Sequence, residues 1–185
     1  MRSSDDEEAA GEVVRATAQL IRRAWALLGE ATLRPPLRSD QLSRLLVLTR
    51  TRLCEFPFQS RTLGMAIPWG AQEHAILIDR TAARADYAFT LRHELAHVLA
   101  GEVSHALFLA TADTLSYSER RADLFAIADL VPARMLTHLR GTGRRWSVLE
   151  LEVQQAFREL TGGWSAQRVQ DRAALRVRLF REHGL

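Results

Sequence analysis

The spacing of apolar positions predicts helices near the start of the chain. Between residues 7 and 31, apolar side chains recur at helical spacing, which predicts a long first helix. Pro35-Pro36 interrupts this pattern. Ser39 is a favourable N-cap for a second helix that extends to about Arg50. The first 50 residues are therefore expected to form an N-terminal helical segment.

The pattern changes to short strand-like runs between residues 51 and 80. Leu53–Phe58, Thr62–Trp69 and His74–Ile78 are rich in apolar and β-branched or aromatic residues, with a turn centred on Gly70. They predict a small sheet of about three strands that is mostly antiparallel and locally connected. The run Ala75–Ile78 is the clearest strand, and we interpret it as an exposed edge to which a substrate could add, with a central strand as the alternative.

Helical spacing returns in the rest of the chain. The expected helices cover about residues 86–100, Ser116 or Ser118 to Pro132, Pro132 to Leu139, a capping-box helix from Ser147 to Leu160, and Ser165 to Glu182. The fold class is therefore α+β, with a small sheet packed against several helices and a helical C-terminal piece.

Composition limits the protein class. The 185 residues are 47% hydrophobic and 25% charged, which suits a globular domain with a core. No apolar run approaches the roughly 20 residues that cross a bilayer, and residues 1–8 lack the apolar core of a signal peptide. We therefore expect a cytoplasmic protein with no membrane partner. The single cysteine, Cys54, excludes an internal disulfide and a cysteine-rich zinc site.

Positive charge is concentrated at the C-terminal end. Residues 133–185 hold ten arginines against five carboxylates, whereas the preceding part is slightly acidic. Such an end can face nucleic acid or an acidic partner, or it can be a solvated, arginine-rich helix face. If DNA binds there, charge reversal at Arg172, Arg176 and Arg178 should abolish a salt-dependent affinity.

His93, Glu94 and His97 form an HExxH string on the helix expected at residues 86–100. Two histidines four residues apart project from one helix face, so both imidazoles can bind a single Zn²⁺. Glu94 is placed to take a proton from metal-bound water instead of binding the metal. The string can occur by chance, but the apolar helix around it favours a buried catalytic site.

A catalytic zinc needs a third protein ligand and one open position. Glu119, in the first turns of the next helix, is the best candidate, and its alternative is a buried pair with arginine. Asp123, four residues later, is expected to accept the outer N–H of a ligand histidine, unless it forms a plain helix salt bridge. His105 is the rival ligand, but the HExxHxxGxxH spacing would require histidine where the chain has Val103.

The tetrahedral oxyanion of peptide hydrolysis usually receives a second hydrogen-bond donor. Tyr117, two residues before Glu119, is our candidate for this catalytic role, with His105 next. The alternative for Tyr117 is packing against the start of its helix.

Four segments together resemble the ImmA/IrrE family of metallo-endopeptidases. They are AILID at residues 75–79, FTLRHELAH at 89–97, ERRADLFA at 119–126 and LVP at 130–132. The family often shows a strand, an FTLAHELGH-like helix, an ExEADxFA helix and an LLMP ending in this order. The tail from Trp164 to Arg172 resembles the family's helical end more weakly.

The resemblance implies that His93, His97 and Glu119 hold one Zn²⁺ per chain and that Glu94 is the catalytic glutamate. It also implies cleavage of a partner repressor of the helix-turn-helix class, in a stress, mobile-element or toxin–antitoxin response. Two features depart from the family: the chain has no room for the sensor domain of damage-response members, and Ala96 stands where glycine is frequent.

The resemblance further implies a zincin-like arrangement of the metal helices. We expect an N-terminal helical segment at residues 1–50, a zincin-like metallopeptidase core at 51–140 and a C-terminal helical segment at 141–185, together forming one compact unit. The alternative function is a non-proteolytic regulatory or toxin module that binds a transcription factor or DNA and contains a structural zinc.

Overall fold

The computed structural model describes residues 4–30, 36–59, 62–103, 117–160 and 164–185. Helices and strands follow in the order α1 (Ser4–Leu28), α2 (Ser39–Leu48), β1 (Thr51–Phe56), β2 (Gly64–Gly70), β3 (Glu73–Asp79), α3 (Arg84–Ala100), α4 (Tyr117–Leu130), α5 (Ala133–Gly141), α6 (Trp146–Leu160) and α7 (Ala166–His183). The α+β class and the helical C-terminal piece are therefore confirmed. None of the helices in these described ranges is long and apolar enough to cross a membrane.

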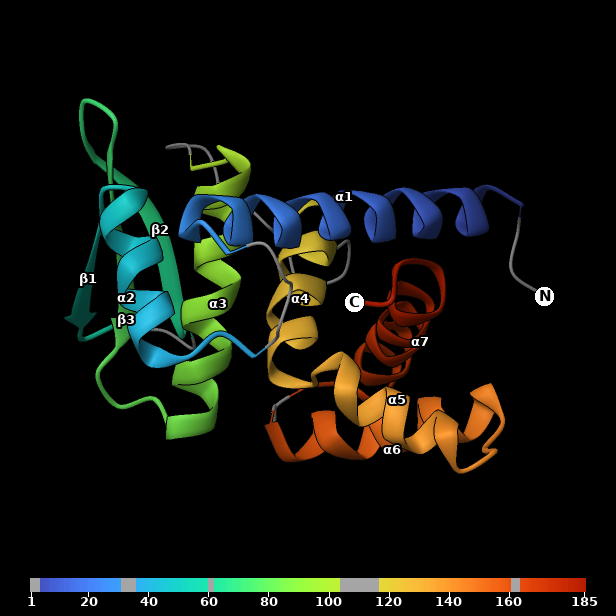
Figure 1. The fold of residues 1–185 in the computed structure, drawn as a ribbon. Helices are drawn as coiled ribbons and strands as arrows, with labels where there is room; N and C mark the ends of the chain where they lie inside the picture. The colour runs from blue at the N-terminus through green and yellow to red at the C-terminus, as the bar shows by residue number, and fades with distance from the viewer. Residues whose placement is uncertain (1–3, 31–35, 60–61, 104–116, 161–163) are drawn as a thin grey trace.

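The three strands form one mixed sheet in the order β1-β3-β2 (Figure 1). β2 and β3 are joined by a tight turn, and they pair antiparallel. β1 pairs with the other side of β3 in parallel, with Thr51 opposite His74. One of the two pairings is therefore parallel, and the segment Ala75–Ile78 lies in the central strand. The expectation that this segment is an exposed edge is wrong, because both of its sides are already hydrogen-bonded to neighbouring strands.

Helix α3 packs against the sheet, and α4 packs against α3. Figure 1 shows the long helix α1 crossing above α3 and α4 and extending toward α7. Ile76 and Ile78 of β3 belong to the same buried hydrophobic cluster as Leu95 of α3 and Phe125 of α4. Burying each such side chain stabilises the fold by about 1.5–3 kcal/mol. This core fixes the position of α3 relative to α4.

A second apolar cluster forms where α5, α6 and α7 meet α4. Leu149 and Phe157 of α6 pack there with Val169 and Val177 of α7. Ser165 caps α7 as predicted, accepting a hydrogen bond from the backbone N–H of Arg168. Ser147 does not cap α6, because that helix begins one residue earlier, at Trp146. The C-terminal helices thus pack against the same helix that carries Glu119.

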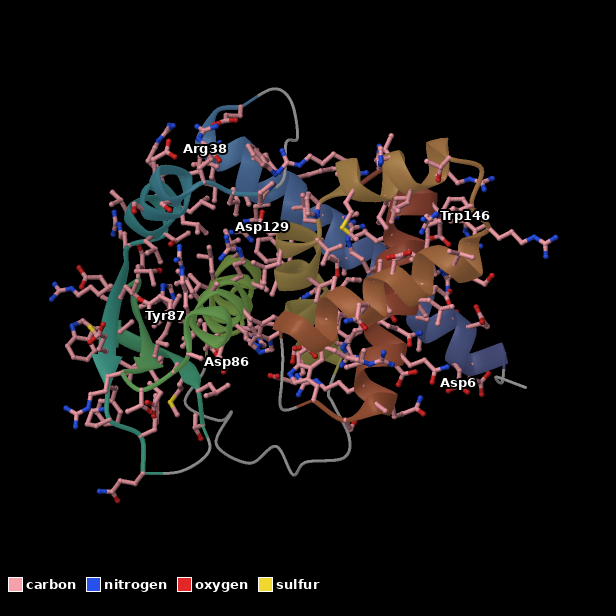
Figure 2. The ribbon with its side chains drawn as sticks, turned by 90° about the horizontal axis from the view of Figure 1, so that it is seen from below. Asp6, Arg38, Asp86, Tyr87, Asp129 and Trp146 are labelled. Carbon is pink, nitrogen blue, oxygen red and sulfur yellow. The ribbon has the colours of Figure 1, made fainter. Side chains whose placement is uncertain are left out.

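An ion pair joins α3 and α4 inside the protein. Arg92 Nε donates to Asp129 Oδ2 at 2.5 Å, and the backbone N–H of Leu37 donates to the other carboxylate oxygen. Figure 2 shows Asp129 in the interior, close to the segment that carries Arg38. The carboxylate therefore ties α3, α4 and the segment before α2 together.

Six of the ten C-terminal arginines are exposed, but four on α7 are partly or fully buried. Arg172 and Arg176 are buried, and Arg176 donates to the main-chain carbonyl oxygens of Val131 and Leu185. Arg178 is mostly covered and pairs with Glu182. Both sequence interpretations of these residues, a DNA-facing surface and a solvated helix face, fail for Arg172 and Arg176, because their guanidinium groups serve as internal donors.

Candidate metal centre

Helix α3 is buried on most of its surface, and both histidines of the HExxH string lie inside. His93 is 9% exposed and His97 is 3% exposed, while Leu95 and Ala96 between them pack into the core. One helical turn separates the two histidines, so their Nε2 atoms lie 3.2 Å apart. The spacing of the two histidines in the sequence thus places their Nε2 atoms close enough to bind one ion.

Helix α4 brings a carboxylate to the same point. Glu119 Oε2 lies 3.2 Å from His93 Nε2, and Glu119 Oε1 lies 3.2 Å from His97 Nε2. The close approach of α4 is favoured by Ala122, a small residue that is buried on the helix. Glu119 therefore lies where a third ligand to the same ion would be needed.

The donor set fits a zinc ion. One ligand atom from each of His93, His97 and Glu119 can be chosen so that all lie within 4.8 Å of one another. Zinc bonds of about 2.0–2.1 Å in a tetrahedron place ligand atoms about 3.3 Å apart, close to the 3.2 Å spacings found. Two imidazoles and one carboxylate are a ligand set that leaves a fourth position open.

The electrostatics of the site favour a positive charge. Burial alone would lower the pKa of His93, but hydrogen bonds with Asp123 and Glu119 outweigh this effect and raise its pKa to about 10. Hydrogen bonds from His93 and His97 lower the pKa of Glu119 far below its usual range. Carboxylates that stabilise a proton on an imidazole this strongly would stabilise a bound cation in the same way.

Glu94 lies beside the donor set without belonging to it. Burial raises the pKa of its carboxyl group, although the positive charge that His93 and His97 can carry acts in the opposite direction. The backbone N–H of Ala66, in β2, donates a hydrogen bond to the Glu94 side chain. A carboxylate with a raised pKa is a suitable proton acceptor near neutral pH.

His93 is oriented by a buried charge network from α4 and α7. Asp123 lies beside His93, with its Oδ1 3.0 Å from His93 Nδ1. Arg168 Nη2 donates to both oxygens of Asp123 at 2.9 Å, and Arg172 Nε donates to one of them at 2.9 Å. Burial acts to raise the pKa of Asp123, but His93 and the two arginines outweigh it and keep this pKa low.

His97 has a separate carboxylate partner at the end of α3. Gly101 adopts a left-handed conformation with φ of 74°, and the next N–H, that of Glu102, returns to the carbonyl oxygen of His97. This turn places Glu102 Oε2 3.5 Å from His97 Nδ1. Arg121 of α4 forms an ion pair with the same Glu102 oxygen. Each histidine therefore has a carboxylate beside its Nδ1 atom, and that carboxylate in turn pairs with arginine.

A cleft of about 630 Å³ opens over the donor set. The sheet contributes Gly64 together with the preceding Leu63, and Trp164 and Arg168 come from the start of the α7 region. In Figure 2, Asp86 marks the N-terminal end of α3, and this residue also lines the cleft. The residues contributed by α3 and α4 are Asp86, Phe89, Thr90, His93, Glu94 and Glu119.

Tyr117 begins α4, and its ring lies 5.5 Å from the guanidinium carbon of Arg121. It is partly exposed and is absent from the described lining of the cleft, and its oxyanion role stays a prediction. His105, the rival ligand, lies outside the described residues.

Apart from Asp123, sequence reasoning did not identify the groups that surround the candidate ligands. Glu102 could have been found, because a glycine stop after a ligand helix turns the next side chain back toward the last turn. Arg168 and Arg172 are four apart on α7, as two residues on one helix face should be, but their partner is 45 or more positions away. No local pattern predicts that contact.

Comparison with protein families gives one match. Residues 52–162 match the model described as IrrE N-terminal-like domain, Peptidase_M78. Neither curated proteins nor solved structures provided a match. The matched range contains all of the sheet except its first residue, together with α3, α4 and all three candidate ligands. The chain therefore belongs to the IrrE N-terminal-like domain family of peptidases.

Proposed function

We propose that this protein is a zinc-dependent endopeptidase. Membership of the family supports a metallopeptidase-type function. The observation that carries the proposal is the convergence of His93, His97 and Glu119, whose ligand atoms lie within 4.8 Å of one another beside Glu94 in one cleft. A zinc ion held there would polarise a substrate carbonyl and lower the pKa of a water molecule at its open position.

Glu94 acts as the general base and then as the general acid. Its buried carboxylate has a raised pKa, so it can accept a proton from the attacking water near neutral pH. The same group then donates that proton to the leaving amine. The hydrogen bond from the Ala66 N–H keeps the carboxylate at the sheet side of the cleft during both transfers. Tyr117 remains our candidate for oxyanion stabilisation.

The substrate lies in the cleft as an extended segment along β2. This strand is an edge of the three-stranded sheet, and Gly64 at its start lines the cleft. The main-chain N–H of Ala66 is directed at Glu94 and not at β3, so the free side of β2 faces the catalytic glutamate. Edge strands bind extended peptides through main-chain hydrogen bonds. β2 thus takes the role that the sequence had suggested for Ala75–Ile78.

The natural substrate that we propose is a helix-turn-helix repressor in the cytoplasm, cleaved in a stress, mobile-element or toxin–antitoxin response. The support for this step is the resemblance of residues 75–132 to metallo-endopeptidases that act on such repressors. The alternative, DNA binding by the basic C-terminal helix, is weakened because Arg172 and Arg176 are buried and bonded internally.

Co-expression with the helix-turn-helix regulator encoded nearest to this gene tests the substrate. We expect a cleaved regulator with the wild type and an intact regulator with Glu94→Gln, a variant that retains all three ligands. Cleavage by both proteins would contradict the role of Glu94. An intact regulator in both cultures, from a wild type that hydrolyses other peptides, would contradict the choice of substrate alone.

A further inference from the structure

One wall of the cleft comes from the C-terminal part of the chain. Trp164 and Arg168 line the cleft together with the candidate ligands, although the family match ends at residue 162. Arg168 is the single cation among the described lining side chains other than histidine, and it shares the cleft with the carboxylates of Asp86, Glu94 and Glu119. A cation at this position needs an explanation beyond the packing of α7.

The guanidinium of Arg168 is fixed on two sides. Its Nη2 donates to both oxygens of Asp123 at 2.9 Å. Its guanidinium carbon lies 3.9 Å from the centre of the Trp164 ring. The Trp164 ring in turn meets Phe89 edge to face, with centroids 5.0 Å apart. Because the group is held before a ligand arrives, little conformational entropy is lost when it binds one.

Part of the same guanidinium is left without a partner. Arg168 Nε is buried without a hydrogen-bond acceptor, and Nη1 donates to none of the described residues. The side chain is 30% exposed, so it reaches the open space of the cleft. An oxygen acceptor that enters the cleft would therefore find Nη1 already charged and oriented.

We propose that Arg168 is a substrate-binding residue, whose Nη1 donates to an oxygen of the peptide in the cleft, either a main-chain carbonyl or a carboxylate side chain. Trp164 and Phe89 provide the apolar surface beside that oxygen. The inference rests on the proposed peptidase function, and it assigns a binding role to the C-terminal helix region that the ligand triad alone does not require.

Arg172 offers a matched control. Its Nε donates to the same Asp123 carboxylate at 2.9 Å, but its side chain is only 3% exposed and does not line the cleft. If Arg168 acted only by holding Asp123, Arg168→Met and Arg172→Met should affect ligand binding alike. If Arg168 contacts the peptide, only Arg168→Met should weaken binding of ligands that extend beyond the metal.

The test uses zinc-loaded wild type and both variants, with their folding checked by circular dichroism. Isothermal titration calorimetry measures the affinities of three probes: acetohydroxamate, a dipeptidyl hydroxamate with uncharged side chains, and the same compound with a glutamate side chain. We expect Arg168→Met to weaken the peptidyl probes roughly tenfold to a hundredfold relative to acetohydroxamate, the effect of losing one charge-assisted hydrogen bond. For Arg172→Met, the ratio of peptidyl probe to acetohydroxamate affinity should match the wild type.

The two peptidyl probes distinguish the source of the oxygen. An equal loss for both identifies a main-chain carbonyl, whereas a loss confined to the glutamate probe identifies a carboxylate. If Arg168→Met fails to fold, Arg168→Lys takes its place and should show a smaller loss of the same kind, because the cation remains but the planar fork is gone.

Equal effects of the Arg168 and Arg172 variants on that ratio would overturn the proposal, as would an unchanged ratio in Arg168→Met. A wild type that binds neither Zn²⁺ nor acetohydroxamate would instead refute the peptidase function on which it rests. The two failures are therefore distinguishable in one set of titrations.

Discussion

Replacing Asp123 by asparagine removes one charge from the network behind His93 and keeps the shape of the side chain. Asp123 is 0% exposed and contacts His93, Arg168 and Arg172 at 2.9–3.0 Å. In Asp123→Asn, the buried guanidinium of Arg172 keeps its charge but loses its counter-ion. Breaking a buried ion pair on one side typically costs about 3–5 kcal/mol. That loss is a large part of the total of roughly 5–15 kcal/mol that stabilises a typical domain.

Glu102→Gln is the matched control at the other ligand. Glu102 also faces a ligand histidine and an arginine, but its side chain is 30% exposed. Glu102 is thus more accessible to solvent than Asp123, although the atoms that pair with Arg121 are themselves buried, so we expect a smaller stability loss than in Asp123→Asn. Both carboxylates lie behind a ligand, and loss of such a partner typically weakens metal binding about 10–100-fold. The two variants should therefore be similar in zinc affinity and different in stability.

Urea unfolding of chelator-treated proteins measures the stability, and competition with a chromophoric chelator measures the zinc affinity. The pKa of Asp123 is lowered in the folded protein, so its stabilising effect is present above its unfolded pKa of about 3.9 and is lost as the pH falls through the folded value. The difference between wild type and Asp123→Asn should shrink accordingly in acid. A stability loss no greater than that of Glu102→Gln would refute the buried network.

Three further predictions address the sheet, the ligand and the helix pair. Gly64→Ala should lower the free energy of unfolding in urea by about 1–3 kcal/mol, because the new Cβ would lie 2.2 Å from Thr90 Cγ2. Adding Thr90→Ala should recover part of this loss. An unchanged free energy of unfolding in Gly64→Ala would contradict this packing. Zinc affinity should rise with pH through neutrality, because His93, whose pKa is raised to about 10, must release a proton to bind the metal. Calorimetry in buffers of different ionisation enthalpy should detect that proton. A zinc affinity that does not depend on pH would contradict its release. Asp129→Asn should lower the free energy of unfolding in urea by about 3–5 kcal/mol, because the buried guanidinium of Arg92 loses its counter-ion. Zinc affinity in a chelator competition should stay unchanged. Weakened zinc binding would show that this pair also positions the candidate ligands.

The convergence of the three candidate ligands could be predicted because the geometry of the two histidines is local. His93 and His97 lie on one face of a single helix, so their spacing alone brings the two nitrogens together. Glu119 was proposed from its place at the start of the next helix, and α4 does bring it within 3.2 Å of both histidines. The family-like segments around these residues favoured Glu119 as the third ligand over its alternative, a buried pair with arginine.

The pairing of the strands could not be predicted because it depends on contacts between distant segments. The apolar run Ala75–Ile78 fits a central strand as well as an edge, and only the pairing with β1 decides between them. Arg172 and Arg176 were misinterpreted for a related reason. Charge composition favours a solvated face, but Arg172 donates to Asp123 and Arg176 to the carbonyl oxygen of Val131, each more than 40 residues away, and Arg176 also donates to the carbonyl oxygen of Leu185. The strand pairing and the burial of Arg172 and Arg176 therefore depend on tertiary contacts that local sequence patterns do not indicate.

The measurement that tests the central claim most directly is hydrolysis of a peptide library by zinc-loaded protein, wild type against Glu94→Gln, with the zinc content of both determined. Our account predicts one Zn²⁺ per chain in both proteins, cleavage by the wild type and a loss of cleavage in Glu94→Gln by several orders of magnitude. Zinc bound equally by both proteins with no wild-type cleavage, or with cleavage that survives Glu94→Gln, would contradict it.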